Sequence, residues 1–274
     1  MKLTTLYIIG TPLGNLEDIT LRAQKVFREL KHFFAEDTRE LARLFNLLGI
    51  SLEGKKIHSY ASHNLKDATQ FALEILKSES VGLVTDRGMP AISDPGAQLV
   101  AAAREQNIRI SPIPGPSAVT TLVSVAGLRS SDFHFVGFLP HSQKEREKLW
   151  KRVKEWPTPL CFFESPKRVR ETLSELSLHF PSGQVLIGRE MTKQFEAFSL
   201  IKLNEMDQVT VNEQGEFSAI LIPGETSTPS PWEEEVELRL LSDKEWSKAV
   251  AGRVGCSSSD LYNALQKKKR TDSK

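Results

Sequence analysis

Short apolar runs alternate with longer mixed stretches over the first 115 residues of the chain. The runs lie at residues 6–10, 32–36, 56–60, 81–85 and 108–113. Each is rich in apolar, branched or aromatic residues and is followed by polar or turn-forming residues, which is typical of buried strands. Alternation of such strands with helical stretches predicts a mainly parallel sheet covered by helices on both faces.

One of the intervening stretches has a clear helical period. In residues 65–76 the apolar positions recur at spacings of three and four, which places them on one face of a helix. The residues expected on that buried face are Leu65, Ala68, Phe71, Ala72, Ile75 and Leu76.

A second alternating region follows the Pro-Gly-Pro turn at 114–116. Its apolar runs lie at residues 133–139, 159–164, 184–190, 195–203 and 215–223. No long helical stretch separates the last three runs, so we expect parallel and antiparallel pairing within one sheet. The domain boundary is expected within residues 115–130, which gives α/β domains at 1–116 and 117–224.

The remainder of the chain predicts a small helical module at 232–274. Residues 225–231 (ETSTPSP) are typical of a linker. Ser242 and Glu245 have the spacing of a capping box, and a second helical pattern begins at Ser257 after a glycine, so a helix-turn-helix-like pair is expected. The basic residues at 267–270 favour RNA contact, and a hairpin used for packing or dimerisation is the alternative.

Composition places the protein among soluble globular chains. Hydrophobic residues make up 39% and charged residues 26%, and no stretch approaches the roughly 20 apolar residues of a membrane span. The first apolar run is too short for a signal peptide, so we expect a cytoplasmic protein without a membrane partner. Cys161 and Cys256 lie far apart without nearby ligand spacing, so neither a disulfide nor a metal site is expected.

Positive charge is concentrated in one segment although the net charge is only +1. Residues 141–170 contain nine Lys or Arg against four Glu. A segment of this kind is either the solvated face of a helix or a surface for nucleic-acid phosphates. The candidates for RNA contact are Lys144, Arg146, Lys148, Lys167 and Arg168.

Small or polar residues follow all five strands of the first sheet. The segments concerned are 10–15, 36–39, 63–64, 85–96 and 114–118. Ligands of parallel α/β sheets bind beyond the carboxyl ends of the strands, so these segments are expected to surround a binding site.

The loops do not have the sequence of a nucleoside triphosphate site. Residues 10–15 (GTPLGN) lack the Lys-Ser/Thr of a P-loop, and several prolines in these loops remove backbone donors. A less anionic, partly apolar ligand, approached by glycine backbone and a few carboxylates, suits them better. S-adenosylmethionine has those properties, although composition alone does not select it. Asp86 and Asp94 could instead make only turn and helix-cap hydrogen bonds.

Eight segments resemble, in order, the motifs of one family. They are TPLGNLEDIT (11–20), AEDTR (35–39), SHN (62–64), D-x-G-x-P-x-I-S-D-P-G (86–96), PGPSA (114–118), GFLP (137–140), FFESPKR (162–168) and REMTK (189–193). Together they are similar to the tetrapyrrole methylase superfamily, in particular to its ribosomal RNA branch, over about residues 6–224.

The resemblance implies an α/β fold of two domains with a cofactor cleft between them and a small C-terminal helical module. It also implies a homodimer that transfers a methyl group from S-adenosylmethionine to the 2′-hydroxyl of a decoding-centre cytidine in small-subunit ribosomal RNA. The residues that its motifs assign to the cofactor are Pro12, Leu13, Asp86, Gly88, Met89, Ile92, Ser117, Ala118 and Phe163.

Charged residues within the same motifs are the catalytic candidates. Glu36, Asp37 and Glu190 could remove the hydroxyl proton. Arg39, Lys193 and Arg168 could hold phosphate or orient the ribose. Phe162 and Phe163 could stack a splayed base, although aromatic residues in an apolar strand are more often part of a core.

Four positions depart from the usual motifs, namely Leu65, Arg87, Met89 and Lys167. Arg87 and Met89 stand where the family usually has small residues, at the edge of the expected cofactor site. Two other functions stay open: methylation of a small tetrapyrrole or corrin precursor, and noncatalytic RNA binding.

Overall fold

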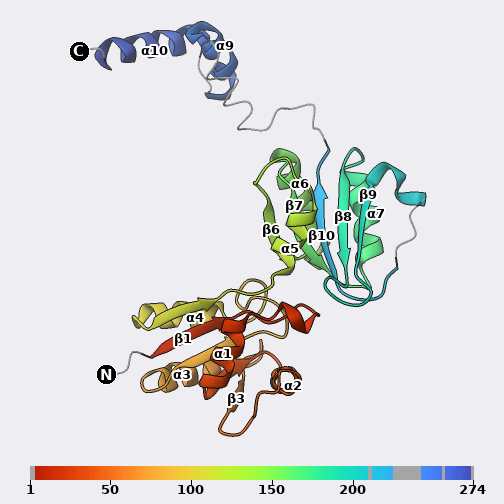
Figure 1. Ribbon diagram of the computed structural model, residues 1–274. Helices are drawn as coiled ribbons and strands as arrows, with labels where there is room; N and C mark the ends of the chain where they lie inside the picture. The colour runs from red at the N-terminus through yellow and green to blue at the C-terminus, as the bar shows by residue number, and fades with distance from the viewer. Residues whose placement is uncertain (1–3, 209–211, 225–241, 255–256, 273–274) are drawn as a thin grey trace.

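The computed structural model describes residues 4–208, 212–224, 242–254 and 257–272, and contains two five-stranded sheets (Figure 1). All ten predicted strands are confirmed within one or two residues of their expected bounds. They are recovered because each is a short apolar run between turn residues, a local signal that needs no tertiary information.

The first sheet is entirely parallel. Its strands are β1 (Thr5–Ile9), β2 (His32–Ala35), β3 (Lys56–Ser59), β4 (Val81–Val84) and β5 (Arg109–Ile113). They lie in the order β3-β2-β4-β1-β5, so all five carboxyl ends meet at one edge.

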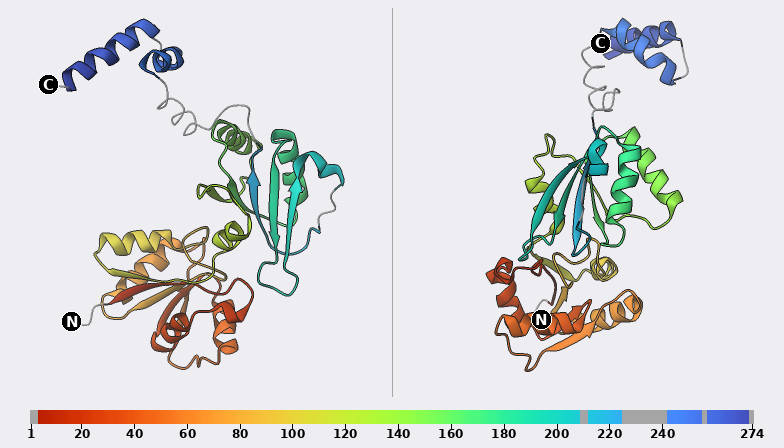
Figure 2. Two further views of the ribbon diagram at one scale, coloured as in Figure 1. Left: turned by 45° about the horizontal axis from the view of Figure 1, so that its top comes forward. Right: turned by 90° about the vertical axis from the view of Figure 1, so that its right-hand side faces the viewer.

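Helices cover both faces of this sheet (Figure 2). The helices on one face are α1 (Leu21–Glu29) and α2 (Thr38–Leu47), and those on the other are α3 (Leu65–Leu76) and α4 (Ala97–Glu105). Consecutive residues Phe33 and Phe34 of β2 are fully buried on opposite faces, as expected for a strand covered on both sides.

The predicted buried face of α3 is wrong at one position. Phe71 is 49% exposed. Its ring makes edge-to-face contacts with the rings of His58 and Phe34. The apolar face of α3 is therefore narrower than its hydrophobic residues suggested.

The second sheet mixes parallel and antiparallel pairs, as predicted. Its strands are β6 (His134–Phe138), β7 (Leu160–Glu164), β8 (Gln184–Arg189), β9 (Ala197–Lys202) and β10 (Phe217–Ile222), in the order β6-β7-β10-β8-β9. Only the β6–β7 pair is parallel. Helices α6 (Gln143–Glu155) and α7 (Val169–His179) cover one face, and α5 (Ala118–Val125) covers the other.

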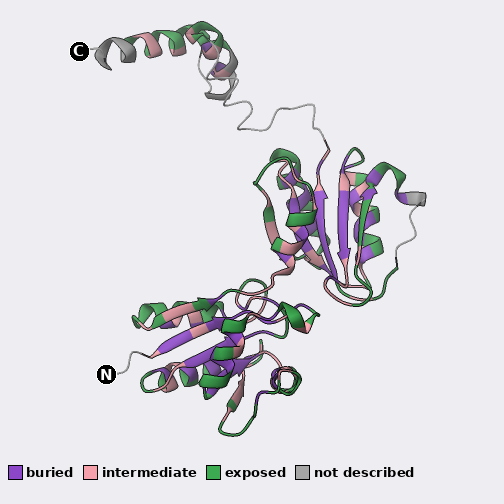
Figure 3. Cartoon of the chain, viewed as in Figure 1, coloured by how far each residue is buried: buried purple, intermediate pink, exposed green. Residues whose placement is uncertain are grey.

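Burial follows this layered plan (Figure 3). The strands are mostly buried, whereas the outward faces of the helices are exposed. Two short 3-10 helices, η1 (Leu16–Asp18) and η2 (Leu203–Gln208), follow β1 and β9.

The C-terminal helices are α9 (Asp243–Val254) and α10 (Ser258–Asp272), and they pack against each other. The predicted capping box is confirmed, since the Ser242 N–H donates to Glu245 Oε2 at 3.0 Å and Ser242 Oγ accepts from the Glu245 N–H at 3.4 Å. The expected linker at 225–231 and the start of the module lie outside the described residues. No helix in the described ranges has the length and apolar character to cross a bilayer.

The chain leaves the first sheet through a close backbone crossing. The Gly10 N–H donates to Ile113 O at 3.1 Å, and a Cβ added to Gly10 would lie 2.7 Å from the Gly115 Cα. Only glycine permits that approach. Helix α5 then packs on the second sheet through Val119 and Leu122, and we propose on this ground that the domains divide between residues 116 and 117.

Candidate active site

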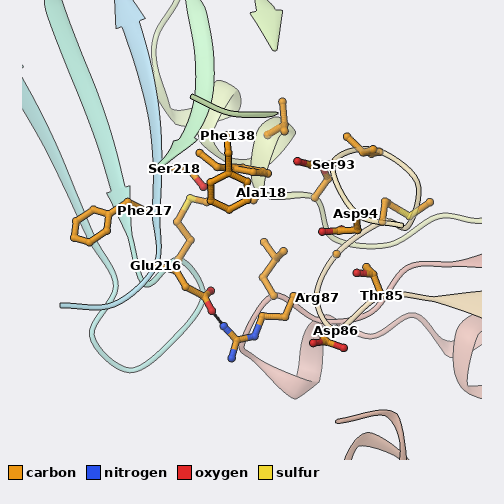
Figure 4. A pocket seen from close by; sticks show the side chains of 18 of the residues that line it. Thr85, Asp86, Arg87, Ser93, Asp94, Ala118, Phe138, Glu216, Phe217 and Ser218 are labelled. Carbon is orange, nitrogen blue, oxygen red and sulfur yellow. Dashed lines mark ion pairs between the residues drawn. The ribbon is translucent and has the colours of Figure 1, made fainter. Parts of the chain in front are cut away.

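A cavity of about 630 Å³ lies at the carboxyl ends of the first sheet and is lined by both domains (Figure 4). Its volume is within the range of small-molecule sites. The first domain contributes Leu13, Glu36 and the loop after β4, and the second contributes α5, Phe163 and residues 216–218. The position agrees with the rule that ligands bind at this edge of a parallel sheet.

The loop after β4 forms one wall of the cavity. A two-way backbone bridge fixes it to the loop after β1: the Thr11 N–H donates to Gly88 O at 2.9 Å, and the Gly88 N–H donates to Thr11 O at 3.1 Å. Gly88 has φ +78°, a conformation that side chains disfavour. Because of this bridge, main-chain atoms line this wall of the cavity. A ligand can therefore come close to the backbone here.

Carboxylates gather at the floor of the cavity. The Thr85 hydroxyl donates to Glu36 Oε2 at 2.7 Å, and Asp86 Oδ1 accepts the Asp37 N–H at 3.0 Å. Burial raises the pKa of Asp86, and the negative charge of Glu36 adds to this effect.

Asp94 is the functional candidate that the sequence analysis missed. It lines the cavity near Thr85, and burial, reinforced by the charge of Glu36, raises its pKa to about 6. Its other interpretation, as the cap of α4, is wrong, because Gly96 precedes that helix and no side chain caps it. Asp94 belongs to the motif at 86–96, but no local pattern shows its burial, which depends on the tertiary contacts around the cavity.

A chain of alternating charges crosses from one domain to the other. Arg87 of the β4 loop forms an ion pair with Glu216, which precedes β10 (Figure 4). Lys193 Nζ lies 3.0 Å from Glu216 Oε2 and 2.9 Å from Glu190 Oε1. The loops also meet directly, because the Asn15 N–H donates to Thr192 Oγ1 at 3.2 Å.

Arg87 and Met89 leave the cavity open. Arg87 extends across the cleft to Glu216, whereas Met89 packs into the core beside α3 and α4 and contacts the Gly10 region. Both residues contribute to the walls of the cavity.

The structure brings most of the expected cofactor residues together. Those that line the cavity are Leu13, Asp86, Gly88, Met89, Ile92, Ser117, Ala118 and Phe163, whereas Pro12 is not among the lining residues.

The catalytic candidates fall into three groups. Glu36 lines the cavity. Asp37 and Arg39 pair with each other at 2.6 Å at the start of α2, where Asp37 also caps the helix, and Arg39 holds the pKa of Asp37 at about 2. Glu190 and Lys193 are not among the lining residues, but both contact the lining residue Glu216: Lys193 Nζ lies 3.0 Å from Glu216 Oε2, and Glu190 Oε1 accepts the Glu216 N–H at 2.8 Å.

The expected RNA contacts are only partly on the surface. Lys144, Lys148 and Lys167 are exposed. Arg146 is 7% exposed and donates from Nε to Glu175 Oε2 at 2.6 Å, so the interpretation of Arg146 as an RNA contact is wrong. Arg168 is half-buried and donates to Glu164 Oε2 and Leu139 O at 2.8 Å each.

Of the two interpretations of Phe162, core packing is confirmed and base stacking is wrong. Phe162 is 1% exposed and belongs to the core between the second sheet and helices α6 and α7. Phe163, the next residue, points to the other face and lines the cavity.

The cavity suits a partly apolar cation. Leu13, Met89, Ala118 and Phe163 give it apolar walls, and the carboxylates of Glu36, Asp86 and Asp94 give it negative charge. A sulfonium compound with an aromatic adenine matches both properties, because apolar walls can pack on the faces of the ring and carboxylates stabilise a nearby cation. The residues present therefore fit S-adenosylmethionine.

Comparison with known proteins agrees with this reading. The model of the family described as Tetrapyrrole (Corrin/Porphyrin) Methylases matches residues 5–207, a range that includes nearly all of the cavity wall. Fold, cavity and match together define a two-domain α/β methylase. The chain belongs to the tetrapyrrole methylase family, whose methyl donor is S-adenosylmethionine.

Two relatives and one solved structure are similar over most of the chain. Ribosomal RNA small subunit methyltransferase I of Halalkalibacterium halodurans is 36% identical over 94% of this chain and 93% of its own length. The protein of the same name from Thermotoga maritima is 42% identical over 73% of this chain and 89% of its own. The crystal structure of diphthine synthase superposes with a TM-score of 0.62 at 15% identity, covering 88% of this chain and 96% of that one, which shows the shared fold.

Proposed function

We propose that this protein transfers a methyl group from S-adenosylmethionine to small-subunit ribosomal RNA, at the ribose 2′-hydroxyl of a decoding-centre cytidine. The observation that carries the proposal is the nearly full-length similarity to ribosomal RNA small subunit methyltransferase I, combined with a donor-sized cavity between the domains. The cytidine and its position come from the resemblance of the motifs.

Backbone and apolar contacts would hold the donor. We assign this role to Leu13, Gly88, Met89, Ala118 and Phe163, all of which line the cavity. Asp86 and Ser117 add polar groups beside them. When bound, S-adenosylmethionine supplies an electrophilic methyl group. The two domains would then act mainly by holding the reacting atoms about 3 to 3.5 Å apart and in line.

The carboxylates are assigned to the hydroxyl proton. Glu36 accepts a hydrogen bond from Thr85 at the cavity floor, and Asp94 lies in the same group. Since the pKa of Asp94 is about 6, this carboxyl is mostly ionised at pH 7.5 and is able to accept a proton. A positioned base of this kind contributes about 10²–10⁴-fold to a rate.

The exposed lysines would guide the RNA. Lys144 and Lys148 lie on α6, and Lys167 lies in the loop before α7. Neutralising phosphates in this way makes affinity fall steeply with salt. We propose the same purpose for the C-terminal helix pair, and a cytoplasmic homodimer as the working form.

The decisive test is methylation of the proposed substrate. The protein is incubated with labelled donor and small ribosomal subunits from a strain that lacks the modification, and the labelled nucleotide is mapped. We expect label on one ribose 2′-oxygen. Unlabelled RNA together with a methylated tetrapyrrole would overturn the proposal, and absence of donor binding by calorimetry would favour a noncatalytic RNA-binding role.

The two candidate bases are compared in the same assay. Glu36→Gln and Asp94→Asn are measured under single-turnover conditions with saturating donor. We expect the variant that removes the base to lower the rate by about 10²-fold or more while donor affinity changes less. Full activity in either variant removes that residue as the base.

A further inference from the structure

Phe138 is an exposed aromatic residue at the active-site cavity. It ends β6, is 59% exposed, and still lines the cavity (Figure 4). Its ring meets that of Phe163 edge-on at 5.6 Å, and Phe163 meets Phe135 in the same manner at 5.1 Å. The Phe138 ring is thus supported on one side by other rings and open on another.

The local backbone does not follow a regular strand at this point. The register between β6 and β7 shifts between Phe135 and Phe138. Irregularities of this kind re-aim side chains and occur often beside active sites. This shift is not visible in the sequence, where Phe162 and Phe163 were the candidates for stacking and Phe138 was not.

A second exposed apolar side chain faces the cavity from the other domain. Ile92, in the loop after β4, is 53% exposed and lines the same cavity. The two loops approach each other closely, since a Cβ added to Gly137 would lie 3.1 Å from Ser93 Oγ. Phe138 follows Gly137 in the chain, and Ile92 precedes Ser93. Phe138 and Ile92 therefore lie on facing segments at the rim of the cavity.

We propose that Phe138 and Ile92 form a slot for the base of the target nucleotide, with the base stacked on Phe138. The inference rests on the proposed function and deepens it by naming how the substrate is held. Proteins that recognise single-stranded RNA stack splayed-out bases on aromatic side chains, which compensates for the stacking lost between neighbouring bases. A base held at the rim would point its ribose into the cavity that Glu36 and Asp94 also line.

The adenine of the donor is the competing occupant. Two of the residues assigned to the donor lie deeper, since Leu13 is only 7% exposed and Gly88 is buried, whereas Ile92, which the motifs had assigned to the cofactor, lies at the rim. Phe138 and Ile92 are more than half exposed, which suits the macromolecule that arrives from solvent. If the slot holds the RNA base, a substitution of Phe138 changes the affinity for the small subunit. If it holds adenine, the substitution changes the affinity for the donor.

The experiment compares Phe138→Ala, Phe138→Leu and Phe138→Trp with wild type. Donor affinity is measured by calorimetry, and single-turnover methylation is measured against the concentration of small subunits. Loss of stacking is expected to raise the half-saturating subunit concentration about 5- to 100-fold in Phe138→Ala. Phe138→Leu keeps an apolar group and should resemble Phe138→Ala, whereas Phe138→Trp should restore binding. Donor affinity should stay within about twofold.

Phe71→Ala is the matched control. Phe71 is 49% exposed on α3 and is not a lining residue of the cavity, so neither constant should change. A Phe138→Ala variant that weakens donor binding and leaves subunit binding intact would assign the slot to adenine and overturn the inference, as would a variant without either effect. A wild-type protein that methylates no ribosomal RNA would refute the proposed function itself, a result visible before any variant is compared.

Discussion

At the scale of single residues, the ionisation of Asp94 is the main electrostatic feature of the cavity. Its pKa is about 6 in the folded protein and 3.8 in a model peptide. The folded state therefore binds more protons than the unfolded state between these values, and folding stability contributed by this group falls as pH rises through that window. Above pH 6 the cost is fully present, and below about pH 4 it is absent.

Replacing Asp94 by Asn should remove this cost. Asp94→Asn is expected to stabilise the protein by about 1 kcal/mol at pH 7.5, a value reduced for solvent screening, and to have little effect at pH 4. Chemical denaturation at the two pH values measures the difference. Asp132→Asn, at an exposed position, serves as the control. A destabilised Asp94→Asn at pH 7.5 would mean that the ionised carboxylate makes a favourable contact in the fold.

At the scale of elements, α6 shows that the number of basic residues in a segment does not tell which of them lie on the exposed face of a helix. Arg146 lies three, four and seven residues before Leu149, Trp150 and Val153, all of them buried. The helical period therefore carried the information that Arg146 belongs to the core face. Its partners Glu164 and Glu175 come from β7 and α7, and no local pattern identifies them.

The buried pair should be required for folding of the second domain. Arg146→Ala leaves the carboxylate of Glu175 without its main cation and is expected to destabilise the protein by about 3–5 kcal/mol. Lys148→Ala, two residues along the same helix and exposed, should change stability by less than about 0.5 kcal/mol. Unfolding in denaturant compares the two. An equal effect of both substitutions would contradict the structural role of Arg146.

Prediction from sequence succeeded for individual elements and less well for their faces and partners. Strands such as 81–84 are continuous apolar runs between turns, so their position is a local property. The exposure of Phe71 and of Phe138 depends on how neighbouring elements pack, and that information is spread along the chain. The cavity residues were found because motifs mark them, whereas the sequence left Asp94 open between a role at the ligand and a helix cap, and the cap is wrong.

At the scale of the whole molecule, the ion pair of Arg87 and Glu216 joins the two domains across the mouth of the cavity. Both side chains are substantially exposed, so the pair is weak in energy and sensitive to salt. Because the pair crosses the mouth of the cavity, we expect it to slow the entry and release of the donor. Arg87 is also a departure from the usual motif, which gives this protein a contact that a small residue would not provide.

Removal of the pair should speed the release of the donor. Arg87→Ala and Glu216→Gln are each expected to raise the dissociation rate of labelled S-adenosylmethionine about two- to fivefold at low salt, with a smaller effect at high salt. Both changes break the Arg87–Glu216 contact, and Glu216→Gln also weakens the pair with Lys193, so the double variant should exceed Glu216→Gln by little. Rapid filtration of the labelled complex measures the rates. Lys25→Ala, which removes a surface pair on α1, is the control. Additive effects would show that the two residues act separately.

The backbones of Gly10 and Gly115 make a close contact at the point where the two domains are joined. Gly115 lies within the Pro-Gly-Pro turn that carries the chain into the second domain, and its backbone lies so close to that of Gly10 that neither position has room for a side chain. A methyl group added at either glycine would force these backbones apart, and we expect it to change how the two domains are placed across the cavity. Two residues without side chains are thus expected to influence the width of the active site.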